Sequence, residues 1–95
     1  MNIQHKDDGK AGVFYIEKDG EIVAEMAYTW QGKGTIVITH TEVDESLEGQ
    51  GIGKQLVEKG VDFARKKSIK VIPQCPFAKK VIDRTPAFQD VVQQQ

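Results

Sequence analysis

The chain has 95 residues, 39% of them hydrophobic and 28% charged, and its 13 basic residues nearly balance its 14 acidic ones. This length supports one apolar core and so one domain, residues 1–95, and the near-zero charge argues against nucleic acid or an anionic membrane as partner. No apolar run reaches the roughly 20 residues that span a bilayer, and the polar start does not resemble a signal peptide. We expect a cytoplasmic protein.

Side chains that bind metals are few. Cys75 is the only cysteine, and the two histidines are His5 and His40. A lone cysteine cannot form an internal disulfide and suits a reducing compartment, while a structural zinc site normally takes four Cys or His ligands. The sequence therefore predicts no metal ion.

Three antiparallel strands are predicted in the first half of the chain. Residues 12–18 and 22–30 alternate as strands, and Asp19-Gly20 between them is a pair typical of tight hairpins. Residues 35–43 are rich in β-branched side chains on both faces, as in a central strand that is covered on both sides. Residues 12–18 would then form the edge of the sheet, where a second copy could pair, so we expect a monomer or a weak homodimer.

The end of the third strand carries a candidate proton-transfer group. A period of two places Ile36, Ile38, His40 and Glu42 on one face, so the histidine and the carboxylate follow two core residues towards the next loop. A histidine in this position is more often a packed or capping residue than a catalytic one. Both interpretations stay open at this stage.

The second half of the chain predicts a crossover helix, a parallel strand and a short helix. Apolar residues recur at helical spacing from Gln50 to about Lys67, and an apolar strand follows over residues 68–72. Pro73 should loosen pairing at the end of that strand. A short helix is expected over residues 77–83 after Pro76, then a docked turn over residues 87–92, with residues 93–95 frayed. The fold class is α+β with a mixed sheet.

The stretch from Glu48 to Gly53 joins the third strand to the long helix and contains three glycines. Glycine permits positive φ and close approach of a ligand to the backbone, and the start of a helix offers unpaired N–H groups and a positive dipole end. Such a loop suits a phosphate, although a merely flexible turn is the simpler interpretation. It is neither a P-loop, since Gln55 follows Gly53-Lys54, nor a dinucleotide fingerprint, since its glycines are evenly spaced.

This loop resembles motif A of the GNAT superfamily of N-acetyltransferases. That motif, Q/R-x-x-G-x-G/A, lies between a central strand and a long helix and reads here Glu48-Gly49-Gln50-Gly51-Ile52-Gly53. The resemblance is closest to small GNAT-like proteins with a His-Thr-x-Val run, matched by His40-Thr41-Glu42-Val43, and a cysteine after the next strand, matched by Cys75. It covers about residues 22–88 and implies a minimal GNAT-like fold.

The resemblance implies an acetyl-CoA-dependent N-acetyltransferase whose acceptor is an amine of a small molecule or a protein. Loop amides would hold the pyrophosphate, and the backbone at the end of the third strand would pair with the pantetheine arm. His40 would transfer a proton to or from the amine, while Cys75 would protonate the leaving thiolate or accept the acetyl group, unless it is only a buried packing residue. The implied cofactor-binding residues are Glu42, Val43, Gly49, Gln50, Gly51, Ile52, Gly53 and Lys54.

Two departures from the family pattern keep other functions open. Glu48 replaces the Gln or Arg of the motif and puts a carboxylate beside the phosphate site, with Lys54 available to offset it. Phe77 stands where many GNAT enzymes carry a tyrosine that acts as general acid, and phenylalanine cannot donate a proton. The alternatives are a module that binds CoA or acetyl-CoA without turnover, and an interaction domain without a ligand.

Overall fold

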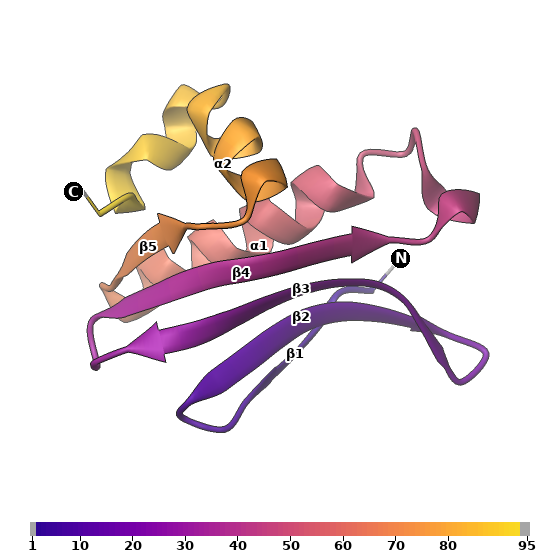
Figure 1. The fold of residues 1–95 in the computed structure, drawn as a ribbon, viewed down its shortest axis with the longest axis horizontal. Coiled ribbons are helices and arrows are strands. Elements are labelled where there is room, and N and C mark those ends of the chain that lie inside the picture. Colours follow the sequence, from indigo (N-terminus) through magenta and orange to yellow (C-terminus); the bar gives the residue numbers. More distant parts are fainter. Residues whose placement is uncertain (1, 94–95) are drawn as a thin grey trace.

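The computed structural model describes residues 2–93, which form one five-stranded sheet with helices packed against it (Figure 1). The sheet order follows the chain, β1 to β5, and every neighbouring pair is antiparallel except the parallel pair β4 and β5. The strands are β1 (Gln4–Asp7), β2 (Ala11–Lys18), β3 (Glu21–Gln31), β4 (Thr35–Val43) and β5 (Lys70–Pro73). The helices are η1 (Glu45–Leu47), α1 (Ile52–Lys67), α2 (Pro76–Asp83) and η2 (Pro86–Val91).

The predicted mixed sheet, crossover helix and C-terminal helix are confirmed. Helix α1 begins at Ile52 rather than Gln50 and ends at Lys67 as expected, where Ser68 takes a left-handed conformation with φ of 57°. The C-terminal turn is η2. The predicted fraying is wrong for Gln93, whose N–H bonds to the Val71 carbonyl at 2.9 Å, and the rest of that prediction lies outside the described residues.

Strand β1 was not among the predicted strands. Its residues pair in register with β2, Gln4 opposite Tyr15 and Asp7 opposite Gly12, so β2 lies inside the sheet and the predicted edge at residues 12–18 is wrong. All of β1 is exposed and polar, which is why no apolar alternation marks it. Tertiary contacts hold it in place: the His5 ring stacks on the Phe14 ring with centroids 4.1 Å apart.

The core lies on one face of the sheet, beneath α1. Met26, Ile36 and Ile38 of the sheet pack in one buried cluster with Leu56 and Val61 of α1. Helices α2 and η2 lie at the β5 end of the sheet and contact α1. Among the described residues no helix covers the opposite face, which we call the open face, so the prediction that β4 is covered on both sides is wrong.

A β-bulge changes which side chains of β4 face the core. Ala27 pairs with His40, but the next residue of β3, Tyr28, pairs with Ile38, so Thr39 is an extra residue. A single extra residue reverses the alternation of all later side chains. Thr41 therefore shares the core face with Ile38, and His40 lies on the open face.

An Asp7 network fastens β1 to the sheet. The Tyr28 hydroxyl and the Trp30 indole N–H, at 2.8 Å, both donate to the Asp7 carboxylate, which also accepts the Gly9 N–H at 2.7 Å. Burial raises the pKa of Asp7, but the hydrogen bonds from Tyr28, Gly9 and Trp30 outweigh it and leave the pKa below its ordinary value. The ionised form therefore stabilises the fold at neutral pH.

We expect Asp7→Asn to lower the free energy of unfolding by about 1 kcal/mol at pH 7, because hydrogen bonds to a charged acceptor are stronger than those to a neutral one. A depressed pKa contributes stability above the ordinary carboxyl pKa, and the contribution is lost as pH falls through the folded-state value. The difference between wild type and variant should therefore shrink towards pH 3 in urea unfolding. Asp19→Asn, in an exposed turn that suits either residue, is the control, and a difference independent of pH would contradict the charge argument.

Candidate functional site

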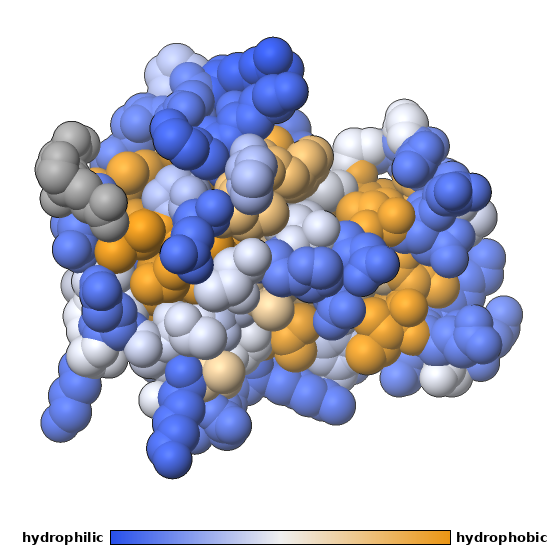
Figure 2. All heavy atoms as spheres, in the orientation of Figure 1, coloured by the Kyte–Doolittle hydropathy of each residue, from blue (hydrophilic) through white to orange (hydrophobic). Residues whose placement is uncertain are grey.

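A cavity of about 520 Å³ opens where the end of β4, the glycine loop, the start of α1 and α2 meet. Figure 2 shows apolar side chains gathered over this end of β4 and the loop, surrounded by hydrophilic surface. The cavity joins two segments that are apart in the sequence, residues 41–54 and residues 77–81. Its lining comprises Thr41, Val43, Leu47, Glu48, Gly49, Gly51, Ile52, Gly53, Lys54, Phe77 and Val81.

The glycine loop presents bare backbone to this cavity. Gly49 and Gly51 have φ of 83° and 72°, a conformation that favours glycine, and an added Cβ at either would meet no atom within 4 Å. Gly51 caps α1 without a side-chain hydrogen bond, and no acidic residue lies in the first turn. The first N–H groups of α1 therefore have no side-chain partner and can receive an anion.

Phe77 of α2 forms the wall opposite the loop. A Cβ added at Gly53 would lie 2.5 Å from the Phe77 ring, so only glycine lets the ring lie against α1. Phe77 remains 42% exposed, and Val81, one turn later, lines the same cavity. From the sequence, Phe77 and Val81 were expected to turn inward from the short helix, and Phe77 also to lack the proton that a tyrosine would donate, but neither was expected to line a ligand cavity. The spacing of four residues between Phe77 and Val81 was the available signal for a second wall.

The parallel strands separate beside the cavity. Pairing of β4 with β5 ends at Ile38 opposite Pro73, and the last contact is the Cys75 N–H bonded to the Ile38 carbonyl at 2.9 Å. From Thr39 to Val43, β4 has no strand on that side among the described residues. An extended ligand can therefore pair with the free backbone of β4, as at any open strand edge. The gap follows Pro73, where loosened pairing was predicted.

Cys75 is buried at the inner end of this gap, 6% exposed, directly before α2. Its thiol donates to the Thr41 hydroxyl, with Sγ and Oγ1 3.5 Å apart. Burial raises the pKa of the thiol, but the Thr41 hydroxyl and the backbone N–H groups of Ala78 and Phe77 can donate to the thiolate form, which outweighs burial and lowers the pKa below its ordinary value. A thiol can donate a proton or, as a thiolate, act as a nucleophile, and either role of Cys75 stays a prediction.

The structure does not bring His40 to Cys75. Because of the bulge at Thr39, His40 and Glu42 lie on the open face, and the prediction that they share a face with Ile36 and Ile38 is wrong. The His40 imidazole Nε2 lies 3.2 Å from the Glu42 carboxylate. From here the imidazole can serve only an amine that arrives over the open face, and its role in proton transfer stays a prediction.

The other predicted cofactor-binding residues lie together. Val43, Gly49, Gly51, Ile52, Gly53 and Lys54 line the cavity, whereas Gln50 of the same loop does not and borders a separate hollow beside β1 and β2. Glu42 contributes its backbone to the gap while its side chain points to the open face. The negatively charged Glu48 and the positively charged Lys54 both line the cavity.

Residues 13–91 match the family described as GCN5-related N-acetyl-transferase. The chain is 29% identical to Protein NATD1 of Xenopus tropicalis over 93% of its own length and 82% of that protein, and 30% identical to that of Gallus gallus over 92% and 80%. Its structure superposes with a TM-score of 0.75 on a GCN5-like protein of Staphylococcus aureus that is 34% identical, covering 99% of this chain and 91% of that one.

A more distant structure contains a ligand. A GNAT family acetyltransferase from Elizabethkingia anophelis with acetyl-CoA bound is 24% identical and covers 65% of this chain and 41% of that protein, with a TM-score of 0.56. At this identity the likeness concerns the fold. Within residues 2–93, no helix has the length and apolar character required to cross a membrane.

Proposed function

The chain belongs to the GCN5-related N-acetyltransferase family, and from this premise we propose that it binds acetyl-CoA in the cavity and transfers the acetyl group to an amine. The observation that carries the proposal is the gap between β4 and β5 that ends at Cys75 and opens onto uncapped N–H groups of α1. An anion site and a free strand edge are the two features that a pyrophosphate and a pantetheine arm require.

In this proposal the pyrophosphate lies against the backbone amides from Gln50 to Lys54. The Lys54 side chain offsets the negative charge of Glu48, because both border the same cavity. The pantetheine arm then follows the unpaired edge of β4 at Glu42 and Val43. This direction places the thioester near Thr41 and Cys75 at the closed end of the gap.

The transfer itself needs few groups. The neutral amine attacks the thioester carbonyl, the carbon–sulfur bond breaks, and CoA leaves as a thiolate while the amine nitrogen loses one proton. Backbone N–H groups at the gap stabilise the oxyanion of the tetrahedral intermediate. The Cys75 thiol lies where it can protonate the leaving thiolate or accept the acetyl group first, as a thioester on Sγ.

Phe77 favours a second candidate function, a module that binds acetyl-CoA without turnover. Its ring lines the cavity and contacts Gly53, so it offers apolar contact to a ligand but no proton. This module would bind the same ligand in the same place. It differs only in leaving the thioester intact when amines are added.

Amide chemical-shift titration with acetyl-CoA tests both candidates. We expect shifts at Glu42, at Val43, throughout residues 49–54 and at Cys75, whereas pantetheine, which lacks phosphate, should leave the amides of residues 49–54 unmoved. The absence of shifts at millimolar acetyl-CoA would refute both candidates. Loss of the thioester with a panel of amines, such as lysine, spermidine and a peptide with a free N-terminus, then separates the enzyme from the binding module.

A further inference from the structure

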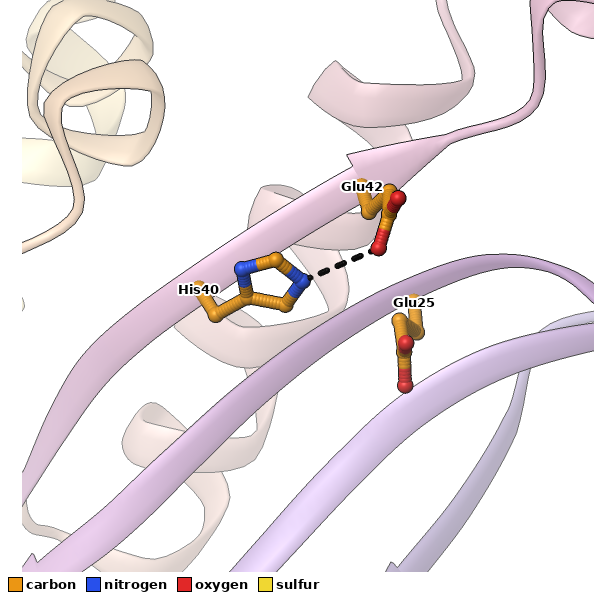
Figure 3. Close-up of side chains that lie close together, drawn as sticks. All are labelled: Glu25, His40 and Glu42. Atoms are coloured by element: carbon orange, nitrogen blue, oxygen red, sulfur yellow. Dashed lines mark hydrogen bonds and ion pairs between the residues drawn. The ribbon is translucent and has the colours of Figure 1, made fainter.

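Three metal-binding side chains meet on the open face, outside the cavity. Glu25 of β3 and His40 and Glu42 of β4 each offer a ligand atom, and these atoms lie within 4.8 Å of one another. Figure 3 shows His40 and Glu42 side by side on β4, joined by a dashed line, and Glu25 on the neighbouring strand β3 with its carboxylate directed away from them in this view. The bulge at Thr39 creates this trio, because without it His40 would face the core.

The strand register sets two carboxylates directly against each other. Glu25 pairs with Glu42, and like charges directly opposite on a sheet destabilise it. Among the described residues neither carboxylate has an ion pair with Lys or Arg, and the only partner of Glu42 is the His40 imidazole at 3.2 Å. A cation between the carboxylates would turn this repulsion into attraction.

The surroundings also favour a cation. Glu25 and Glu42 border a hollow of about 480 Å³ that no Lys or Arg of the described chain lines. A concave surface lined by one sign of charge concentrates counterions. The carboxylates around it are Glu25, Glu42, Asp44, Glu45 and Glu48.

We propose that Glu25, His40 and Glu42 form a binding site for a divalent transition metal ion of the zinc class. An imidazole nitrogen with two carboxylate oxygens is a ligand set that Zn²⁺ accepts, at about 2.0–2.2 Å, with water as the fourth ligand. Mg²⁺ and Ca²⁺ prefer oxygen ligands alone. Rotation of the exposed His40 and Glu42 side chains, 53% and 70% exposed, brings the ligand atoms together.

The site joins β3 to β4 directly behind the cavity. Thr41 and Val43 line the cavity, while the Glu42 side chain between them lies on the open face. A bound ion would therefore cross-link the strand segment whose backbone borders the gap. Binding of the ion does not depend on acetyl transfer and can be measured without acetyl-CoA.

Isothermal titration with ZnCl₂ in a buffer that does not bind zinc tests the site. We expect one equivalent to bind, with affinity reduced at least about tenfold in each of Glu25→Gln, His40→Gln and Glu42→Gln. His5→Gln is the matched control, because it removes the chain's other histidine, which lies on the core face beside Phe14. Cys75→Ser controls for binding by the thiol. Both controls should bind zinc like the wild type, and MgCl₂ should give no comparable heat.

Three outcomes of the zinc titration would overturn the proposal. These are the absence of zinc binding at 100-fold excess over protein, binding that survives Glu25→Gln unchanged, and binding that is lost in His5→Gln or Cys75→Ser instead. An amide chemical-shift titration with spermidine provides a further test. If spermidine shifts the amides of Glu25 and Glu42 and zinc does not, the hollow binds an organic cation and the metal site is overturned. A circular dichroism spectrum and a melting curve show that each variant is folded under the conditions of the zinc titration.

Discussion

Gly51→Asp should weaken CoA binding at least about a hundredfold while the fold persists. An added Cβ at Gly51 meets no atom within 4 Å, so the side chain fits, and it places a carboxylate where the proposed pyrophosphate rests. Two unit charges 4 Å apart near a protein surface repel by about 4 kcal/mol, which exceeds the loss needed for this effect. At the positive φ of 72°, a residue other than glycine adds roughly 1–2 kcal/mol of backbone strain. This strain lowers the free energy of unfolding but does not change the CoA affinity of the variant that is folded.

Two variants separate charge from backbone strain in this experiment. Gly51→Asn has the same shape without the charge and tolerates a left-handed conformation, so its affinity should fall much less than that of Gly51→Asp. Gly32→Asp makes the same substitution at φ of 66°, also with open space around it, in the turn between β3 and β4. Its affinity should match wild type. Unchanged CoA affinity in Gly51→Asp, measured by titration calorimetry, would refute the pyrophosphate assignment.

The parts of the site that depend on local sequence could be predicted. The glycine loop and the start of α1 follow from glycine spacing and from an apolar repeat, both of which act over a few residues. Pro73 likewise marks where β4 and β5 separate, because its missing N–H is a property of the residue itself. These three features position the cavity, and the structure has them where the sequence indicated, except that α1 begins at Ile52 rather than Gln50.

The features of the fold that depend on contacts with other strands could not be predicted. β1 is polar throughout, and the Asp7 and His5 contacts that hold it are made to residues more than 20 positions away, or to Phe14 in the next strand. The bulge at Thr39 is a property of the pairing with β3, and a run of β-branched residues gives no sign of where an extra residue falls. That one residue moved His40 from the cavity face to the open face.

The same limit explains why no metal site was expected. A count of Cys and His residues can reveal only metal sites in which those residues supply most of the ligands. The trio proposed to bind zinc, Glu25, His40 and Glu42, has one histidine, and the register brings its third side chain from another strand. A site of this kind becomes visible only when the strand pairing is known, which the sequence alone does not provide.

Cys75→Ala should lower the rate of acetyl transfer at least about a hundredfold and change CoA affinity far less. The thiol lies at the closed end of the gap, bonded to Thr41, with a pKa below its ordinary value. Loss of a proton donor or a nucleophile from that position removes an interaction that acts in the transition state rather than in cofactor binding. Release of free CoA from acetyl-CoA, with the amine that is active on wild type, measures the rate, and titration calorimetry measures the affinity.

Two further variants decide what the thiol does. Cys75→Ser keeps a small polar group beside Thr41 but is a far weaker nucleophile, and Thr41→Val removes the hydroxyl partner while keeping the shape. If Cys75 is a nucleophile, mass spectrometry of wild type mixed with acetyl-CoA should detect acetylated Cys75, and Cys75→Ser should be as slow as Cys75→Ala. If it is the proton donor, no acetylated enzyme should form and Cys75→Ser should retain part of the rate. Equal losses of rate and affinity in Cys75→Ala would instead make Cys75 a packing residue, because a cavity beside Ile38 and Ala78 would disturb the gap as a whole.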